Sequence, residues 1–260
     1  MNGKTVLVLA GSRFTADDPL LRQENVAAKA LIPVAGRPML DHVLGSLEKS
    51  GLFTSIRVAM DSRIPSTPGL ASLEATGRAF RYAPARGPAE TVRNILRELP
   101  EGQDLWVCTA DHPMLSPAML QDFHAGRAQK PADIHIGFTQ LERVRQRYPD
   151  AARTRLRFRD GAYSGCNIFA LRTPGADKGL ILWQKLEKDR KNPRRIALSV
   201  GPLLLLRYTL GILTLAGALD ALGRRAGCSA VPVLLDQPEA AIDVDKPGDL
   251  RLVRRIMGDA

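Results

Sequence analysis

Residues 104–113 read DLWVCTADHP. The fold class can be inferred from this run together with the segments on either side of it. Its apolar residues predict a short buried strand, and the polar residues Asp111 and His112 follow that strand directly. Residues 5–11 (TVLVLAG) repeat the arrangement, with Gly11 where the chain must turn. Each run therefore places polar or turn residues at the carboxyl end of a predicted strand.

Helix and strand patterns alternate around these two runs. Further strands are predicted at 55–60 and 79–82, and helices at 38–49 and 89–99. The first of these helices has an apolar stripe made of Met39, Leu40, Val43, Leu44 and Leu47. Such alternation predicts an α/β fold, a mostly parallel twisted sheet with helices on both faces. In sheets of this kind ligands bind beyond the carboxyl ends of the strands.

The pattern is less regular outside this region. Residues 14–30 are polar and are expected to form a long loop. Three later strands (near 134–139, 165–169 and 231–235) and a terminal helix after 242–250 are predicted. Between them, 177–227 has a helical pattern. With no internal repeat or linker visible, we expect a single domain, 1–260, with 177–227 as a helical insertion.

Composition excludes several classes of protein. The 260 residues hold 37 Lys and Arg against 27 Asp and Glu, a net charge of +10, yet only 5% of residues are aromatic. Without a stacking platform or a zinc-finger spacing, we expect no specific nucleic-acid binding. The three cysteines are too widely spaced for a zinc module or a disulfide scaffold. The sequence starts without a signal-peptide pattern, and we expect a cytoplasmic protein.

Residues 185–222 combine charge with hydrophobicity. Lys185–Arg195 holds six basic and two acidic residues, and the strongly apolar stretch 196–222 follows. Arg207 argues against a membrane span, because a central Arg costs about 2.5–3.5 kcal/mol on insertion. The spacing from Ile212 to Leu222 predicts an amphipathic helix. We expect a buried helical hairpin, with peripheral membrane contact through 185–222 as the alternative.

Phosphate binding needs backbone N–H groups at a tight turn together with positive charge. The turn at Gly11 and Ser12 offers the first, and Arg13 and Lys29 offer the second. Neither a Walker A loop nor a dinucleotide fingerprint is present. Taken alone, the turn is better explained as an ordinary strand-to-helix connection.

Carboxylates at strand ends are the candidates for a metal site, because Mg²⁺ prefers one or two carboxylates with phosphate oxygens and water. Asp111 is the first candidate. Asp245 is the second and Asp243 its alternative, and alternate residues of an extended segment share one face. Asp249 is expected to cap the helix that follows. His112 could serve as a general base, but we favour a structural or substrate-side role, because an already ionised phosphate needs no base to attack.

The same residues carry a resemblance to a known family. Four blocks stand in order along the chain: KALIPVAGRPML at 29–40, ARGPAET at 85–91, TADHPML at 109–115 and IDVDKPGDL at 242–250. Together with the opening LVLAGSR, they resemble the MobA-like NTP transferases, which have a GT-A type α/β fold. The family usually has a second Gly where this chain has Ser12, and its loop toward the position of Lys29 is shorter.

The resemblance implies roles for individual residues. The nucleotide-binding set would be Ala10, Gly11, Ser12, Gly87 and Thr91. The catalytic set would be Lys29, Arg13 and Asp111. Mg²⁺ would be held by Asp111, Asp245 and Asp243. The implied reaction transfers a nucleoside monophosphate from an NTP, CTP or GTP, to a phosphorylated small molecule or lipid headgroup, with release of pyrophosphate.

Two other functions fit parts of the sequence. Asp243-Val244-Asp245 matches the DxD motif by which GT-A glycosyltransferases hold a nucleotide-sugar metal, although that motif normally lies mid-domain. A regulatory protein that keeps the nucleotide fold without catalysis is the third hypothesis.

Overall fold

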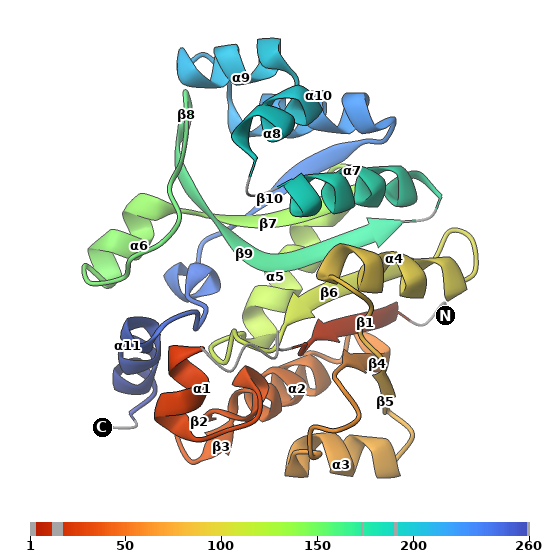
Figure 1. Cartoon of the computed structure of the whole chain (residues 1–260), viewed down its shortest axis with the longest axis vertical. Coiled ribbons are helices and arrows are strands. Elements are labelled where there is room, and N and C mark those ends of the chain that lie inside the picture. Colours follow the sequence, from red (N-terminus) through yellow and green to blue (C-terminus); the bar gives the residue numbers. More distant parts are fainter. Residues whose placement is uncertain (1–3, 12–17, 173, 190–191, 259–260) are drawn as a thin grey trace.

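The structure, a computed structural model, describes residues 4–11, 18–172, 174–189 and 192–258. Within them one sheet has the strand order β10-β7-β9-β6-β1-β4-β5, and β8 pairs with β9 (Figure 1). The bounds are β1 Lys4–Leu9, β4 Phe53–Ala59, β5 Ala79–Tyr82, β6 Asp104–Thr109, β7 Ile134–Gln140, β8 Leu156–Phe158, β9 Gly161–Arg172 and β10 Ala230–Leu235. In this sheet β9 runs antiparallel to β6, β7 and β8, and the pairs without β9 are parallel. The predicted α/β fold with a mostly parallel sheet is confirmed.

Helices cover both faces of the sheet, because successive strand residues point to opposite sides. Val6 and Val8 pack in a cluster with α2 (Met39–Ser50), α3 (Pro68–Ala75) and α5 (Pro117–Ala128). Leu7 packs on the other face with α4 (Pro88–Glu98) and α7 (Gly175–Asp189). Trp106 fills the first cluster, with the Phe53 and Phe123 rings edge-on at 5.3 and 5.0 Å.

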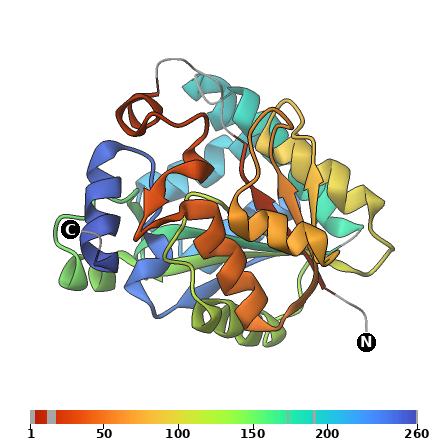
Figure 2. The same ribbon diagram turned by 90° about the horizontal axis from the view of Figure 1, so that it is seen from below.

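A further apolar cluster lies beside the carboxyl ends of the central strands. It joins α1 (Pro19–Glu24), β2 (Pro33–Val34), α6 (Leu141–Arg147) and α11 (Pro247–Met257). The ion pair between Arg254 Nη2 and Glu24 Oε2, 2.5 Å, ties α11 to α1, and Figures 1 and 2 show the two helices next to each other. The short elements η1 (Lys29–Leu31), β3 (Arg37–Pro38) and η2 (Pro238–Ala241) complete this side.

Some local predictions differ from the structure. The expected loop 14–30 contains α1 and η1 in its described part, while 12–17 lie outside the described residues. The helix α6 and the strand β8 were not predicted, because the basic stretch that contains them has few apolar residues to set a period. The strand predicted at 165–169 is the middle of the longer β9.

The helical segment 177–227 consists of α7, α8 (Pro193–Val200), α9 (Pro202–Thr209) and α10 (Leu215–Ala226). The helix α10 buries Leu215, Ala218 and Leu219, as its amphipathic spacing predicts. The expectation of a buried hairpin is wrong for the preceding part, because α9 buries none of its residues. Four consecutive leucines cover every side of a helix, and the neighbouring elements shield only part of that circumference. None of the helices in the described ranges is long and apolar enough to cross a membrane.

Candidate active site

The site is built around Asp111, two residues beyond the end of β6. The N–H of Ala110 donates to Leu9 O (3.0 Å), so the ends of β6 and β1 are held together just before Asp111 and Gly11. The Oδ1 atom of Asp111 is buried and has no hydrogen-bond partner among the described residues. A buried carboxylate oxygen without a partner carries a desolvation penalty that a bound cation would relieve.

The segment that carries the second acidic group meets the first at this point. The N–H of Val244 donates to the carbonyl oxygen of Asp111 (2.8 Å), which fixes residue 245 beside the end of β6. The Asp245 side chain is 68% exposed. Lys29 Nζ lies 3.2 Å from Asp245 O and 3.4 Å from its Oδ1, and it also pairs with Asp18 at 3.8 Å. The structure thus brings together the predicted Asp111, Asp245 and Lys29.

Asp243 is held differently. Its Oδ1 forms an ion pair with Arg153, and its Oδ2 accepts a hydrogen bond from Asn167 Nδ2 (2.8 Å). Arg153 also pairs with the buried Asp249. Both carboxylate oxygens of Asp243 therefore have partners within the protein, which leaves Asp245 as the more available metal ligand of the two.

The expected capping role of Asp249 agrees with the structure. Its Oδ2 accepts from the N–H groups of Asp245 (3.2 Å) and Lys246 (3.1 Å), at the start of α11. Because Asp249 fixes the backbone of Asp245, the helix α11 sets the position of that candidate ligand. Sequence reasoning missed Arg153 and Asn167, and no motif in the sequence marks either residue.

The electrostatics of the site favour a cation. Burial, with a smaller contribution from the carboxylates of Asp243 and Asp245, raises the pKa of Asp111 to about 6, and the Thr109 hydroxyl and Lys29 oppose this rise. The carboxylate form of Asp111 is therefore disfavoured when no cation is bound. Among the described residues, no group of three or more His, Cys, Asp or Glu is arranged to hold a metal ion. A cation here would need oxygen ligands from its substrate or from water, which is the coordination that Mg²⁺ accepts.

Two neighbouring groups are unsuited to acid–base or nucleophilic chemistry. His112 is buried, its Nε2 lies 3.1 Å from Glu239 O, and burial lowers its pKa, which agrees with a structural role. Burial raises the pKa of the Cys108 thiol to about 12, so the thiol stays protonated.

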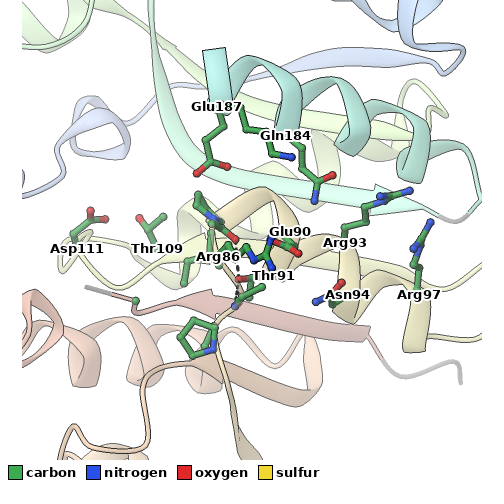
Figure 3. A pocket seen from close by; sticks show the side chains of 18 residues that line it. Arg86, Glu90, Thr91, Arg93, Asn94, Arg97, Thr109, Asp111, Gln184 and Glu187 are labelled. Atoms are coloured by element: carbon green, nitrogen blue, oxygen red, sulfur yellow. Dashed lines mark hydrogen bonds between the residues drawn. The ribbon is translucent and has the colours of Figure 1, made fainter. Parts of the chain in front are cut away.

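A cavity of about 1020 Å³ begins at Asp111 and extends between α4 and α7. Figure 3 shows Asp111 and Thr109 at one end, Arg97 toward the other, and Glu187 and Gln184 reaching in from α7. Of the predicted residues, Gly11, Gly87, Thr91 and Asp111 line the cavity. Lys29 and Asp245 lie beside Asp111 but outside its lining. The polar lining residues that sequence reasoning missed are Arg86, Glu90, Arg93, Asn94, Arg97, Thr109, Gln184, Glu187 and Lys188.

The loop before α4 is held by hydrogen bonds of Thr91 where it borders this cavity. The Thr91 hydroxyl donates to Gly87 O (2.9 Å) and accepts from Ala85 N (2.9 Å), so the buried Thr91 shapes the loop that a ligand would meet. A Cβ atom at Gly87 would lie 2.6 Å from Glu187 Oε1. The absence of a side chain at this position lets Glu187 approach the loop closely.

The remaining predicted residues are placed as follows. Ala10 is buried at the end of β1, where its N–H donates to Ala59 O (3.0 Å). Ser12 and Arg13 lie outside the described residues. Arg93 and Arg97 pair with Asp177 at 2.7 and 3.1 Å and fasten α4 to α7 along the cavity wall.

Comparisons with known proteins agree with this fold. The model of the MobA-like NTP transferase domain matches residues 6–185. A solved structure described as a hypothetical transferase from Thermus thermophilus is similar with a TM-score of 0.79 and 29% identity, covering 95% of this chain and 99% of that one. No curated protein sequence matches the chain.

Two more distant structures share the fold. A CMP:2-keto-3-deoxy-manno-octonic acid synthetase complexed with CTP has a TM-score of 0.58 and 14% identity, covering 99% of this chain and 98% of its own. A 4-diphosphocytidyl-2C-methyl-D-erythritol synthase has a TM-score of 0.59 and 16% identity, covering 99% of this chain and 100% of its own.

Proposed function

Because the chain belongs to the MobA-like NTP transferase family, we propose that it transfers a nucleoside monophosphate from an NTP to a phosphorylated acceptor and releases pyrophosphate. The single observation that carries the proposal is the unpartnered Oδ1 of Asp111 at the mouth of the cavity. Asp245 and Lys29 lie beside it, so one point of the molecule offers two carboxylates and an ammonium group.

Asp111 and Asp245 would hold Mg²⁺. When bound, the ion would supply positive charge to the phosphate oxygens and stabilise the charge of the transition state. The chain's own residues would position the substrates. The backbone at Gly11 and the loop fixed by Thr91 would contact the nucleotide. Lys29 would give up one of its contacts with Asp245 and bind a phosphate oxygen instead. The acceptor phosphate is already ionised and would attack the α-phosphorus without a general base.

The nucleotide is expected to be CTP or GTP. A protein of similar fold is complexed with CTP, which supports placing CTP among the first nucleotides tested. The acceptor would be a phosphorylated small molecule or lipid headgroup. The glycosyltransferase alternative is less well supported, because both carboxylate oxygens of Asp243 are bound by Arg153 and Asn167. A DxD site would need that carboxylate for its metal.

The test measures pyrophosphate release from each of the four NTPs with Mg²⁺ and a panel of phosphorylated acceptors. Asp111→Asn and Lys29→Ala should each lower the rate by about a hundredfold or more, because each removes charge stabilisation from the transition state. Lys49→Ala, on the exposed last turn of α2, is the matched control and should leave the rate unchanged. Release of a nucleoside diphosphate from nucleotide sugars would support glycosyl transfer instead. Inactivity toward both substrate classes would favour a regulatory role.

A further inference from the structure

Exposed apolar side chains gather on one part of the molecule. Six of the nine exposed large hydrophobic residues among the described residues fall between 198 and 212. We define them as the leucine patch: Leu198, Leu203, Leu205, Leu206, Leu210 and Ile212. Their exposed fractions range from 38% to 69%. Such clustering is unusual on a monomer surface and typically marks an interaction site.

The leucine patch is held from beneath, so its exposure does not come from an undocked segment. The Tyr208 ring meets Phe158 of β8 edge-on at 5.4 Å, and the Tyr208 hydroxyl accepts from Arg157 N (3.3 Å). Leu213 O accepts from Arg159 N (2.7 Å). On the other side, the Arg225 guanidinium of α10 donates to Ser199 O (2.6 Å) and Leu198 O (2.7 Å). Figure 1 shows α8, α9 and α10 together, with β8 ending against α9.

The surroundings of the patch are strongly basic. Arg155, Arg157 and Arg159 are exposed on and beside β8, and Arg207 is exposed on α9 itself. The segments 155–160 and 192–228 together contain eight Arg and two Asp, with no Lys or Glu. One of the two, Asp160, caps α10 by accepting from Leu215 N (3.0 Å). The surface therefore offers apolar side chains within a field of positive charge.

We propose that the leucine patch docks on an anionic phospholipid bilayer, with its leucines in the interface and the arginines on the lipid phosphates. Apolar insertion and attraction to anionic headgroups are the two components of interfacial binding by amphipathic helices. A second copy of this chain is the less suitable occupant. A symmetric contact through α9 would bring Arg207 and the β8 arginines close to their own counterparts. The docking does not depend on the proposed transferase activity.

The experiment is flotation of the purified full chain with vesicles of equal parts phosphatidylglycerol and phosphatidylcholine, compared with phosphatidylcholine alone. The wild type should bind the anionic vesicles about tenfold or more tightly than the neutral ones. Raising the ionic strength to about 0.5 M should weaken binding, because it shortens the Debye length.

Two triple variants separate the apolar from the charged contribution. Leu203→Ser/Leu206→Ser/Leu210→Ser and Arg155→Gln/Arg157→Gln/Arg207→Gln should each reduce binding to anionic vesicles about tenfold or more. The matched control changes the three other exposed apolar residues, Phe80→Ser/Ile181→Ser/Leu234→Ser, and should bind like the wild type. Circular dichroism melting curves verify that each variant folds.

Several outcomes would overturn the proposal. Wild-type protein that fails to float with anionic vesicles would do so, as would a leucine-to-serine variant that binds as well as the wild type. Sedimentation showing a dimer that the leucine variant abolishes, together with no vesicle binding, would assign the patch to contacts between copies instead.

Discussion

Replacing Asp111 by Asn should stabilise the protein when no metal or nucleotide is bound. Burial, helped by Asp243 and Asp245, raises the pKa of Asp111 from 3.8 to about 6. A carboxyl group with a raised folded-state pKa favours the folded state at low pH, and this advantage is lost as the pH rises from about 4 through 6. Above pH 7 the buried charge costs the wild type about 3 kcal/mol relative to a neutral group. Asn has the same shape and carries no charge.

The assay is thermal or urea unfolding of both proteins in EDTA between pH 5 and pH 8. The advantage of Asp111→Asn should grow from about 2 kcal/mol at pH 5 to about 3 kcal/mol at pH 8, which is roughly 6–12 °C in melting temperature at pH 8 for a chain of this size. Asp245→Asn is the control and should change stability by less than about 0.5 kcal/mol, because that side chain is largely exposed. The reasoning would be refuted if Asp111→Asn were less stable than the wild type at pH 8. It would also be refuted if the difference in free energy of unfolding between the two proteins did not change with pH.

Three more predictions concern the framework that holds the site. Arg153→Met should lower the free energy of unfolding by about 3–5 kcal/mol in urea, because it leaves the buried Asp249 carboxylate without its cation, and adding Asp249→Asn should recover part of the loss. Trp106→Ala should cost about 3–5 kcal/mol in the same assay, since the ring fills the core between two aromatic neighbours; a loss under 1 kcal/mol would contradict this packing. Gly223→Ala in α10 should cost about 1–3 kcal/mol, because the added Cβ would lie 2.7 Å from a backbone carbonyl oxygen, whereas Gly248→Ala in α11, with nothing nearer than 3.9 Å, should be neutral or stabilising by up to about 1 kcal/mol.

The sheet could be predicted from the sequence where burial imposes a local pattern. The strand β6 (Asp104–Thr109) lies within the run 104–113 where the sequence predicts a buried strand, because a short apolar run is closed on both sides by polar or turn residues. Asp111 was found for the same reason, since it directly follows a buried strand. Asp245 was expected at a strand end, but residues 242–245 have no regular secondary structure. The hydrogen bond from Val244 N–H to Asp111 O, and not a strand of its own, brings Asp245 to the end of β6.

Contacts between distant segments could not be predicted in this way. Arg153 meets Asp243 and Asp249 across 90 and 96 residues, and no spacing in the sequence connects them. Periodicity also shows which residues are apolar without showing what covers them. For that reason the leucines of α9 were expected inside the protein, while the structure places them on its surface.

The central claim is the transfer of a nucleoside monophosphate. It is tested most directly by giving the protein an NTP labelled at the α-phosphate, with Mg²⁺ and the phosphorylated acceptor panel, and following the label. We predict that the label appears in an acceptor product at the same rate as pyrophosphate is released, and that Asp111→Asn lowers both rates by about a hundredfold or more. Label that stays on free nucleotides with every acceptor, or transfer by Asp111→Asn at the wild-type rate, would contradict the claim.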